Sequence, residues 1–115
     1  MAYDVELADR VRAVVQAEPG VTERRMFGGL AFLMRGNMAV SASSQGGLLL
    51  RVDPTQTQSL ISEPHVRRFQ MRGREMDGWL IVDTVALQTD EALRRWVARG
   101  VSFARSVSGG GPRGR

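Results

Sequence analysis

The segment from residue 24 to residue 52 consists of short apolar runs that are separated by turn residues. Runs of this length, bounded by glycine and asparagine, are typical of strands joined by tight hairpins. Strands are predicted at residues 24–35, 38–43 and 48–52. The turns between them are predicted at Gly36-Asn37 and at residues 45–47. Consecutive hairpins restrict this half of the chain to an antiparallel sheet.

Gly28 and Gly29 lie inside the first of these predicted strands. A glycine pair within a strand indicates a bulge or a bend where side chains do not fit. It fits equally well a sharp turn that divides the segment into two strands. The sequence leaves both interpretations open.

One helix is predicted before these strands and another after them. Asp4 can cap the first helix, whose apolar side chains recur with helical spacing. These side chains are Leu7, Val11, Val14 and Val15. Asp53-Pro54 begins the second helix, because aspartate is a good cap and proline is favoured at the first helical position. This short helix ends before Pro64.

A last helix is predicted from about Thr89 to Val107, with Asp90 and Glu91 in its first turn. Its apolar stripe consists of Leu93, Trp96, Val97, Gly100, Val101 and Ala104. The segment 108–115 is rich in glycine and arginine and has nothing to bury. We therefore expect one domain at residues 1–107, followed by a disordered tail.

A second hairpin is predicted between the last two helices. Its strands cover residues 69–72 and 78–82, and a loop that contains Gly73 and Asp77 joins them. The element order is then α-βββ-α-ββ-α, in which the helices can pack on one face of an antiparallel sheet. This order predicts a two-layer α+β domain.

Composition limits the chemistry that we expect of the chain. It contains no cysteine, so a thiolate metal site or a disulfide is excluded and a reducing, cytoplasmic environment is expected. No segment has the pattern of a signal peptide or the length of an apolar membrane span. His65 is the one histidine, and capping explains Asp4, Asp53 and Asp90. We expect no metal, no cofactor and no catalytic residue.

All 16 basic residues are arginine, against 12 acidic residues, which gives a net charge of +4. Arg113 and Arg115 lie in the predicted tail, so the predicted domain itself carries a charge of only +2. A balance this close to neutral favours ordinary solvated surface charge over a dedicated polyanion-binding surface.

Four short segments of the chain resemble one known family. They are Arg-Met-Phe-Gly-Gly-Leu-Ala-Phe at 25–32, Gly-Asn-Met-Ala at 36–39, Leu-Arg-Val-Asp at 50–53 and Gly-Trp at 78–79. On these segments the chain resembles the amino-terminal domain of the TfoX/Sxy competence regulators, as a short single-domain member. The resemblance implies a curved antiparallel sheet with helices in the order given above. It also implies structural roles, without catalysis or metal binding, for Met26, Phe27, Gly28, Gly29 and Trp79.

Two-domain members of that family regulate competence genes together with other transcription factors. We therefore expect a non-catalytic regulatory module that binds a protein partner or a second copy of itself. The expected interface is the sheet face that the helices leave uncovered, because a solvated monomer rarely exposes a large apolar patch. A twist of the sheet, or the last helix, could instead cover this face.

Alternation along the strands divides their side chains between the two faces. The inward set is Leu30, Phe32, Met34, Met38, Val40, Leu48, Leu50, Leu80 and Val82. The outward set is Ala31, Leu33, Ala39, Leu49, Trp79 and Ile81, from which Leu33, Leu49, Trp79 and Ile81 are the candidate interface residues. The expected assembly is a homodimer through these residues.

The alternative function is weak, sequence-tolerant nucleic-acid binding by surface arginines. Arg94, Arg95 and Arg99 lie on the last helix, and Arg68 and Arg72 are expected to share the solvent face of a strand. Such binding would depend strongly on salt, because it rests on counterion release. A third possibility is an enzyme that uses an arginine and a carboxylate on an anionic substrate.

Overall fold

The computed structural model describes residues 3–26 and 28–108. Its helices are α1 (Val5–Val15), α2 (Thr57–Leu60) and α3 (Asp90–Ser108), with 3-10 turns η1 (Pro54–Gln56) and η2 (Thr84–Leu87). Its strands are β1 (Val21–Met26), β2 (Gly29–Met34), β3 (Asn37–Ala42), β4 (Leu48–Arg51), β5 (Val66–Met71) and β6 (Arg74–Val82). The predicted α+β class is confirmed, and residues 109–115 of the predicted tail lie outside the described part of the chain.

The six strands form one sheet in the order β1-β2-β3-β4-β6-β5, with every neighbouring pair antiparallel. The turn between β2 and β3 is Arg35-Gly36, one residue earlier than predicted, and both residues have positive φ, 52° and 88°. That conformation matches the right-handed twist of a two-residue hairpin. The turn between β5 and β6 is built in the same way, so Asp77 lies inside β6 and not in a loop.

The Gly28-Gly29 pair divides the predicted first strand into β1 and β2. Gly28 has a φ of +78°, and Gly29 begins β2 opposite the backbone of β3. A Cβ atom on Gly29 would lie 2.2 Å from the carbonyl oxygen of Ala42. The pair therefore belongs to a tight turn, which adds one strand to the predicted order, while Phe27 lies outside the described residues.

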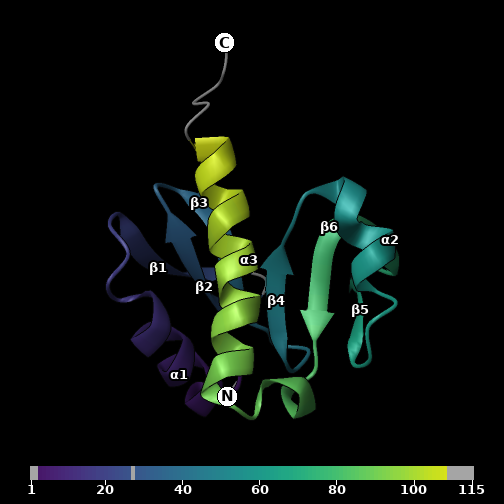
Figure 1. The fold of residues 1–115 in the computed structure, drawn as a ribbon, viewed down its shortest axis with the longest axis horizontal. Coiled ribbons are helices and arrows are strands. Elements are labelled where there is room, and N and C mark those ends of the chain that lie inside the picture. Colours follow the sequence, from purple (N-terminus) through teal and green to yellow (C-terminus); the bar gives the residue numbers. More distant parts are fainter. Residues whose placement is uncertain (1–2, 27, 109–115) are drawn as a thin grey trace.

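The helices α1 and α3 pack on one face of the sheet, where the larger apolar cluster lies (Figure 1). The Asp4 cap is confirmed, because its carboxylate accepts a hydrogen bond of 3.0 Å from the Leu7 N–H. The hydroxyl of Thr89 accepts from the Ala92 N–H in the same way at the start of α3. The predicted inward set lies on this face, with the exception of Met38.

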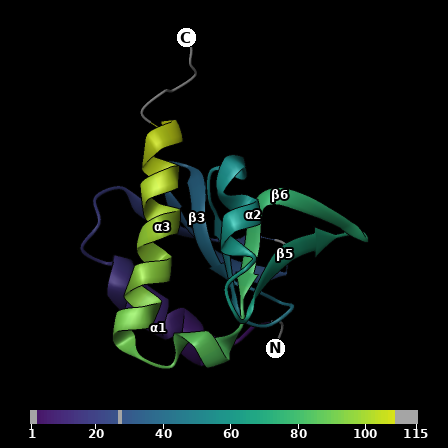
Figure 2. The same ribbon diagram turned by 45° about the vertical axis from the view of Figure 1, so that its right-hand side comes forward.

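A second apolar cluster lies on the opposite face, and it corrects the predicted exposure of that face. Leu33, Leu49 and Ile81 are only 4%, 1% and 0% exposed. The β5–β6 hairpin, which extends on the side of the sheet away from α3 in Figure 2, contributes the side chains that pack there. These side chains are Phe69, Met71, Met76 and the half-buried Trp79.

A register shift between Phe32 and Leu33 explains the two residues that were assigned to the wrong face. Phe32 is opposite Val40 and Leu33 is opposite Met38, which leaves Ala39 as the extra residue of β3. Met38 therefore joins the second cluster, and Ala39 lies on the helix side. The patch that we expected to form the homodimer interface is buried within the chain. Self-association stays a prediction, but this face is not available for it.

Candidate functional site

The position of α3 on the sheet depends on Gly100. A Cβ atom at this residue would lie 2.4 Å from the carbonyl oxygen of Ala39 and 2.8 Å from a methyl group of Val40. Only glycine allows the helix to lie this close to β3. Another side of α3 borders an open space together with Asp53, with Gln56 of η1 and with Glu63, which follows α2.

That space is a groove of about 660 Å³, which we call the α2–α3 groove. Its lining residues are Asp53, Gln56, Glu63, Arg95, Trp96, Ala98, Arg99, Ser102, Phe103 and Ser106. The α2 wall is attached to the sheet by Thr57, whose buried hydroxyl accepts a hydrogen bond of 2.7 Å from the Gly78 N–H. The groove is thus formed by elements that are separately anchored to the sheet.

The two walls of the groove carry opposite charges. Arg95 and Arg99 are exposed on the α3 wall, and Asp53 and Glu63 are exposed on the other wall. Within residues 3–26 and 28–108, none of these four side chains forms an ion pair. The guanidinium of Arg99 lies over the ring of Trp96, 5.4 Å from its centroid. These charged groups are available to a molecule in the groove.

The carboxylate of Asp53 has a second role in the local backbone. It accepts hydrogen bonds from the N–H and the hydroxyl of Thr55, at 2.9 and 2.8 Å. These bonds to Thr55 lower the pKa of Asp53 below its usual value. Asp53 is therefore ionised at neutral pH and begins the 3-10 turn, as its predicted capping role requires.

Arg51 lies next to the groove at the end of β4, opposite Trp79 of β6. Its guanidinium carbon is 4.7 Å from the centroid of the Trp79 ring and 5.2 Å from that of Phe103, which also lines the groove. Burial lowers the pKa of the Arg51 guanidinium. No carboxylate of the described residues forms an ion pair with it. Arg51 is a partly buried cation that contacts two aromatic rings.

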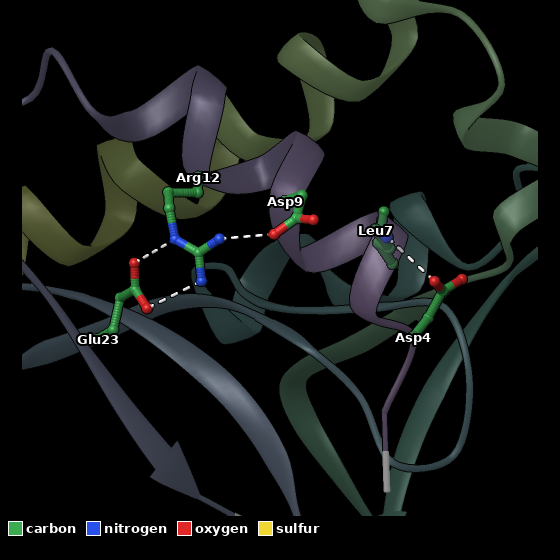
Figure 3. A network of polar contacts seen from close by, with 5 residues as sticks. All are labelled: Asp4, Leu7, Asp9, Arg12 and Glu23. Carbon is green, nitrogen blue, oxygen red and sulfur yellow. Dashed lines mark hydrogen bonds and ion pairs between the residues drawn. The ribbon is translucent and has the colours of Figure 1, made fainter. Parts of the chain in front are cut away.

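A cluster of charged side chains at the other end of the sheet connects α1 to β1 (Figure 3). The guanidinium of Arg12 in α1 donates to both carboxylate oxygens of Glu23 in β1, at 2.6 and 3.1 Å, and to Asp9 at 2.7 Å. The Arg12 hydrogen bonds lower the pKa of Glu23. Arg12 and Glu23 also border a smaller hollow of about 350 Å³. Because these two side chains pair with each other, their charges are already satisfied within the protein.

The structure separates the arginines that were predicted to bind nucleic acid. Arg94, Arg95 and Arg99 are all exposed on α3, but only Arg95 and Arg99 line the groove. Arg68 does not share a solvent face with Arg72, because a register shift in β5 turns it toward α2, where it contacts Asp77 at 3.0 Å and Gln58 at 3.2 Å. Arg72 lies in the hairpin turn.

Two features of this region were missed at the level of sequence. Arg51 and Trp79 lie in two of the segments that carry the family resemblance, and the strand register makes them neighbours. Only the pairing of β4 with β6 brings them together. The groove also needs the docking of α2 and α3, although the Asp53 cap and the arginines of α3 were recognisable separately.

The chain is a small antiparallel α+β domain with a charged groove beside its longest helix, and comparison with known sequences identifies its family. The model of the TfoX N-terminal domain matches residues 13–104, so the chain belongs to that family. No curated protein sequence matches the chain. No helix in the described residues is long and apolar enough to cross a membrane.

Proposed function

We propose that this TfoX N-terminal domain is a non-catalytic regulatory module that holds a segment of a protein partner in the α2–α3 groove. The observation that carries the proposal is the groove itself, with two arginines facing two carboxylates and with Trp96 and Phe103 in its lining. Aromatic and arginine side chains in a hollow are typical of protein interfaces. The resemblance to competence regulators supports a partner from the transcription machinery.

The charges of the groove favour a protein segment over a nucleic acid. A phosphate backbone would be attracted by Arg95 and Arg99 but repelled by Asp53 and Glu63 on the opposite wall. A polypeptide segment that carries both signs of charge can satisfy both walls. Electrostatic complementarity of this kind gives specificity and a fast association rate.

The test is affinity capture from the native cell, with nuclease treatment, using the wild type and three charge-reversal variants. Arg99→Glu and Glu63→Arg reverse one charge on each wall of the groove. Arg24→Glu, on the exposed strand β1, is the matched control. We expect a nuclease-resistant partner that is retained by Arg24→Glu and lost by both groove variants.

Glu63→Arg separates the two function classes. It should weaken binding of a protein segment of mixed charge, since one of its contacts becomes repulsive. It should strengthen binding of a polyanion, because it adds a third arginine to the groove. Capture of nuclease-sensitive material that increases with Glu63→Arg would replace the proposal by the nucleic-acid alternative.

A further inference from the structure

The terminal nitrogens of Arg51 are positioned but have no partner in the described residues. Its Nε is the one side-chain nitrogen or oxygen atom in residues 3–26 and 28–108 that is buried without a hydrogen bond. The two Nη atoms are not buried in this way, and no described residue accepts a hydrogen bond from them. The guanidinium thus has a buried Nε end and an open Nη edge.

Two aromatic rings restrict the position of the Arg51 guanidinium. Trp79 and Phe103 hold the guanidinium carbon at 4.7 and 5.2 Å from their centroids. Stacked arginine loses less freedom when it forms hydrogen bonds than a mobile surface arginine does, because its planar fork is already oriented. A desolvated cation without a counterion is also costly, and a bound anion would remove that cost.

We propose that the Nη edge of Arg51 is a binding site for a carboxylate group. Both Nη atoms can donate to the two oxygens of one carboxylate in the bidentate geometry that arginine favours. A phosphate group carries more charge than the single guanidinium neutralises, so a carboxylate matches the charge of this cation better.

The site lies next to the α2–α3 groove but does not depend on the proposed function. Phe103 contributes to both, since its ring lies near Arg51 and also lines the groove. The carboxylate could therefore come from an acidic side chain of a bound protein or from a free organic acid. Both sources present the same group to Arg51.

The site is tested by nitrogen-15 NMR of the full chain, with sodium acetate as the probe and sodium chloride and sodium phosphate at matched ionic strength as controls. The Arg51 Nε–H and Trp79 indole N–H signals report directly from the site. We expect saturable shifts of both signals with acetate, at a dissociation constant in the millimolar range, as for one bidentate ion pair. Arg51→Lys should weaken acetate binding about tenfold, because lysine cannot form the bidentate pair. The control variant Arg24→Lys should leave it unchanged.

Three results would overturn the site: acetate shifts no larger than those of chloride, tighter binding of phosphate than of acetate, or acetate binding that survives Arg51→Lys. The wild-type titration decides the first two even if Arg51→Lys fails to fold. A blocked pentapeptide with a central glutamate, compared with its glutamine counterpart, distinguishes the sources. Tighter binding of the glutamate peptide than of acetate assigns the site to a protein ligand, and binding of acetate alone assigns it to a free acid. Because these titrations use defined probes, their failure leaves the capture experiment on the groove unaffected.

Discussion

Glu18, after the end of α1, accepts a hydrogen bond from the guanidinium of Arg105 in the last turns of α3. The two residues are 87 positions apart in the sequence, yet they connect the two helices that cover the same face of the sheet. Together with the pair of Arg10 and Asp90, this contact joins α1 to both ends of α3. The helix layer is therefore one unit, whose distance from the sheet is set at Gly100.

Gly100→Ala should destabilise the protein, although glycine to alanine in a helix is ordinarily favourable by about 1 kcal/mol. The added methyl group would lie 2.4 Å from the carbonyl oxygen of Ala39, so α3 must move away from β3. We expect a net loss of roughly 1–3 kcal/mol in the free energy of unfolding. Urea denaturation measures it, with Ser102→Ala on the exposed side of α3 as the control. A stabilised Gly100→Ala would contradict the close contact.

Leu49→Ala should cost about 2–5 kcal/mol of stability, because the side chain is only 1% exposed and packs in the second cluster. Val85→Ala, at a residue that is 50% exposed, should change stability by less than about 0.5 kcal/mol. Leu49→Glu should prevent folding, since it buries an unpaired carboxylate. A folded, fully soluble Leu49→Glu protein would show that this face is accessible to solvent.

Thr57→Val should lower stability by about 1–3 kcal/mol, because it leaves the N–H of Gly78 without an acceptor inside the protein. Thr57→Ser keeps the hydroxyl and should recover most of the loss. Thr84→Val, at an exposed threonine, controls for the change of side-chain type. Thermal unfolding compares the three variants. Equal melting temperatures for Thr57→Val and the wild type would show that this hydrogen bond does not help to hold α2 on the sheet.

The pair of Arg12 and Glu23 should make stability depend on pH in the acid range. The pKa of Glu23 is lower in the folded protein than in the unfolded chain, where it is about 4.3, because Arg12 donates to the ionised form. The contribution of Glu23 is therefore complete above that unfolded value and is lost as the pH falls through the folded value. Both side chains are more than a third exposed, so the contribution is under about 1 kcal/mol.

Glu23→Gln should flatten this part of the pH profile and leave the stability at low pH close to that of the wild type. Urea denaturation between pH 2 and pH 7 measures the profile. Glu6→Gln, at an exposed residue of α1, is the control for loss of one carboxylate. If Glu6→Gln and Glu23→Gln changed the profile equally, the effect would belong to net charge and not to the ion pair.

Local signals in the sequence predicted most of the secondary structure. The caps at Asp4 and Asp53 and the apolar spacing of the helices depend on neighbouring residues, and the structure has these elements where the sequence places them. The faces of Met38 and Ala39 could not be predicted, because simple alternation fails where β3 carries an extra residue. The burial of Leu33 and Leu49 depends on the β5–β6 hairpin, which is distant in the sequence.

The candidate site was less accessible to prediction for the same reason. Arg51 lies in one of the segments that resemble the family, but nothing in that segment indicates that its guanidinium contacts two aromatic rings. Its neighbours Trp79 and Phe103 come from β6 and α3, and their approach is decided by sheet register and helix docking.

The strand β4 contributes to both apolar clusters, with Leu48 and Leu50 in one and Leu49 in the other. None of these three positions can accept a polar residue by turning it toward water. Random mutation should therefore be tolerated less in this strand than on the exposed surface of β1. In a library of variants selected only for folding, Leu48, Leu49 and Leu50 should retain a narrower range of amino acids than residues 22–25 of β1.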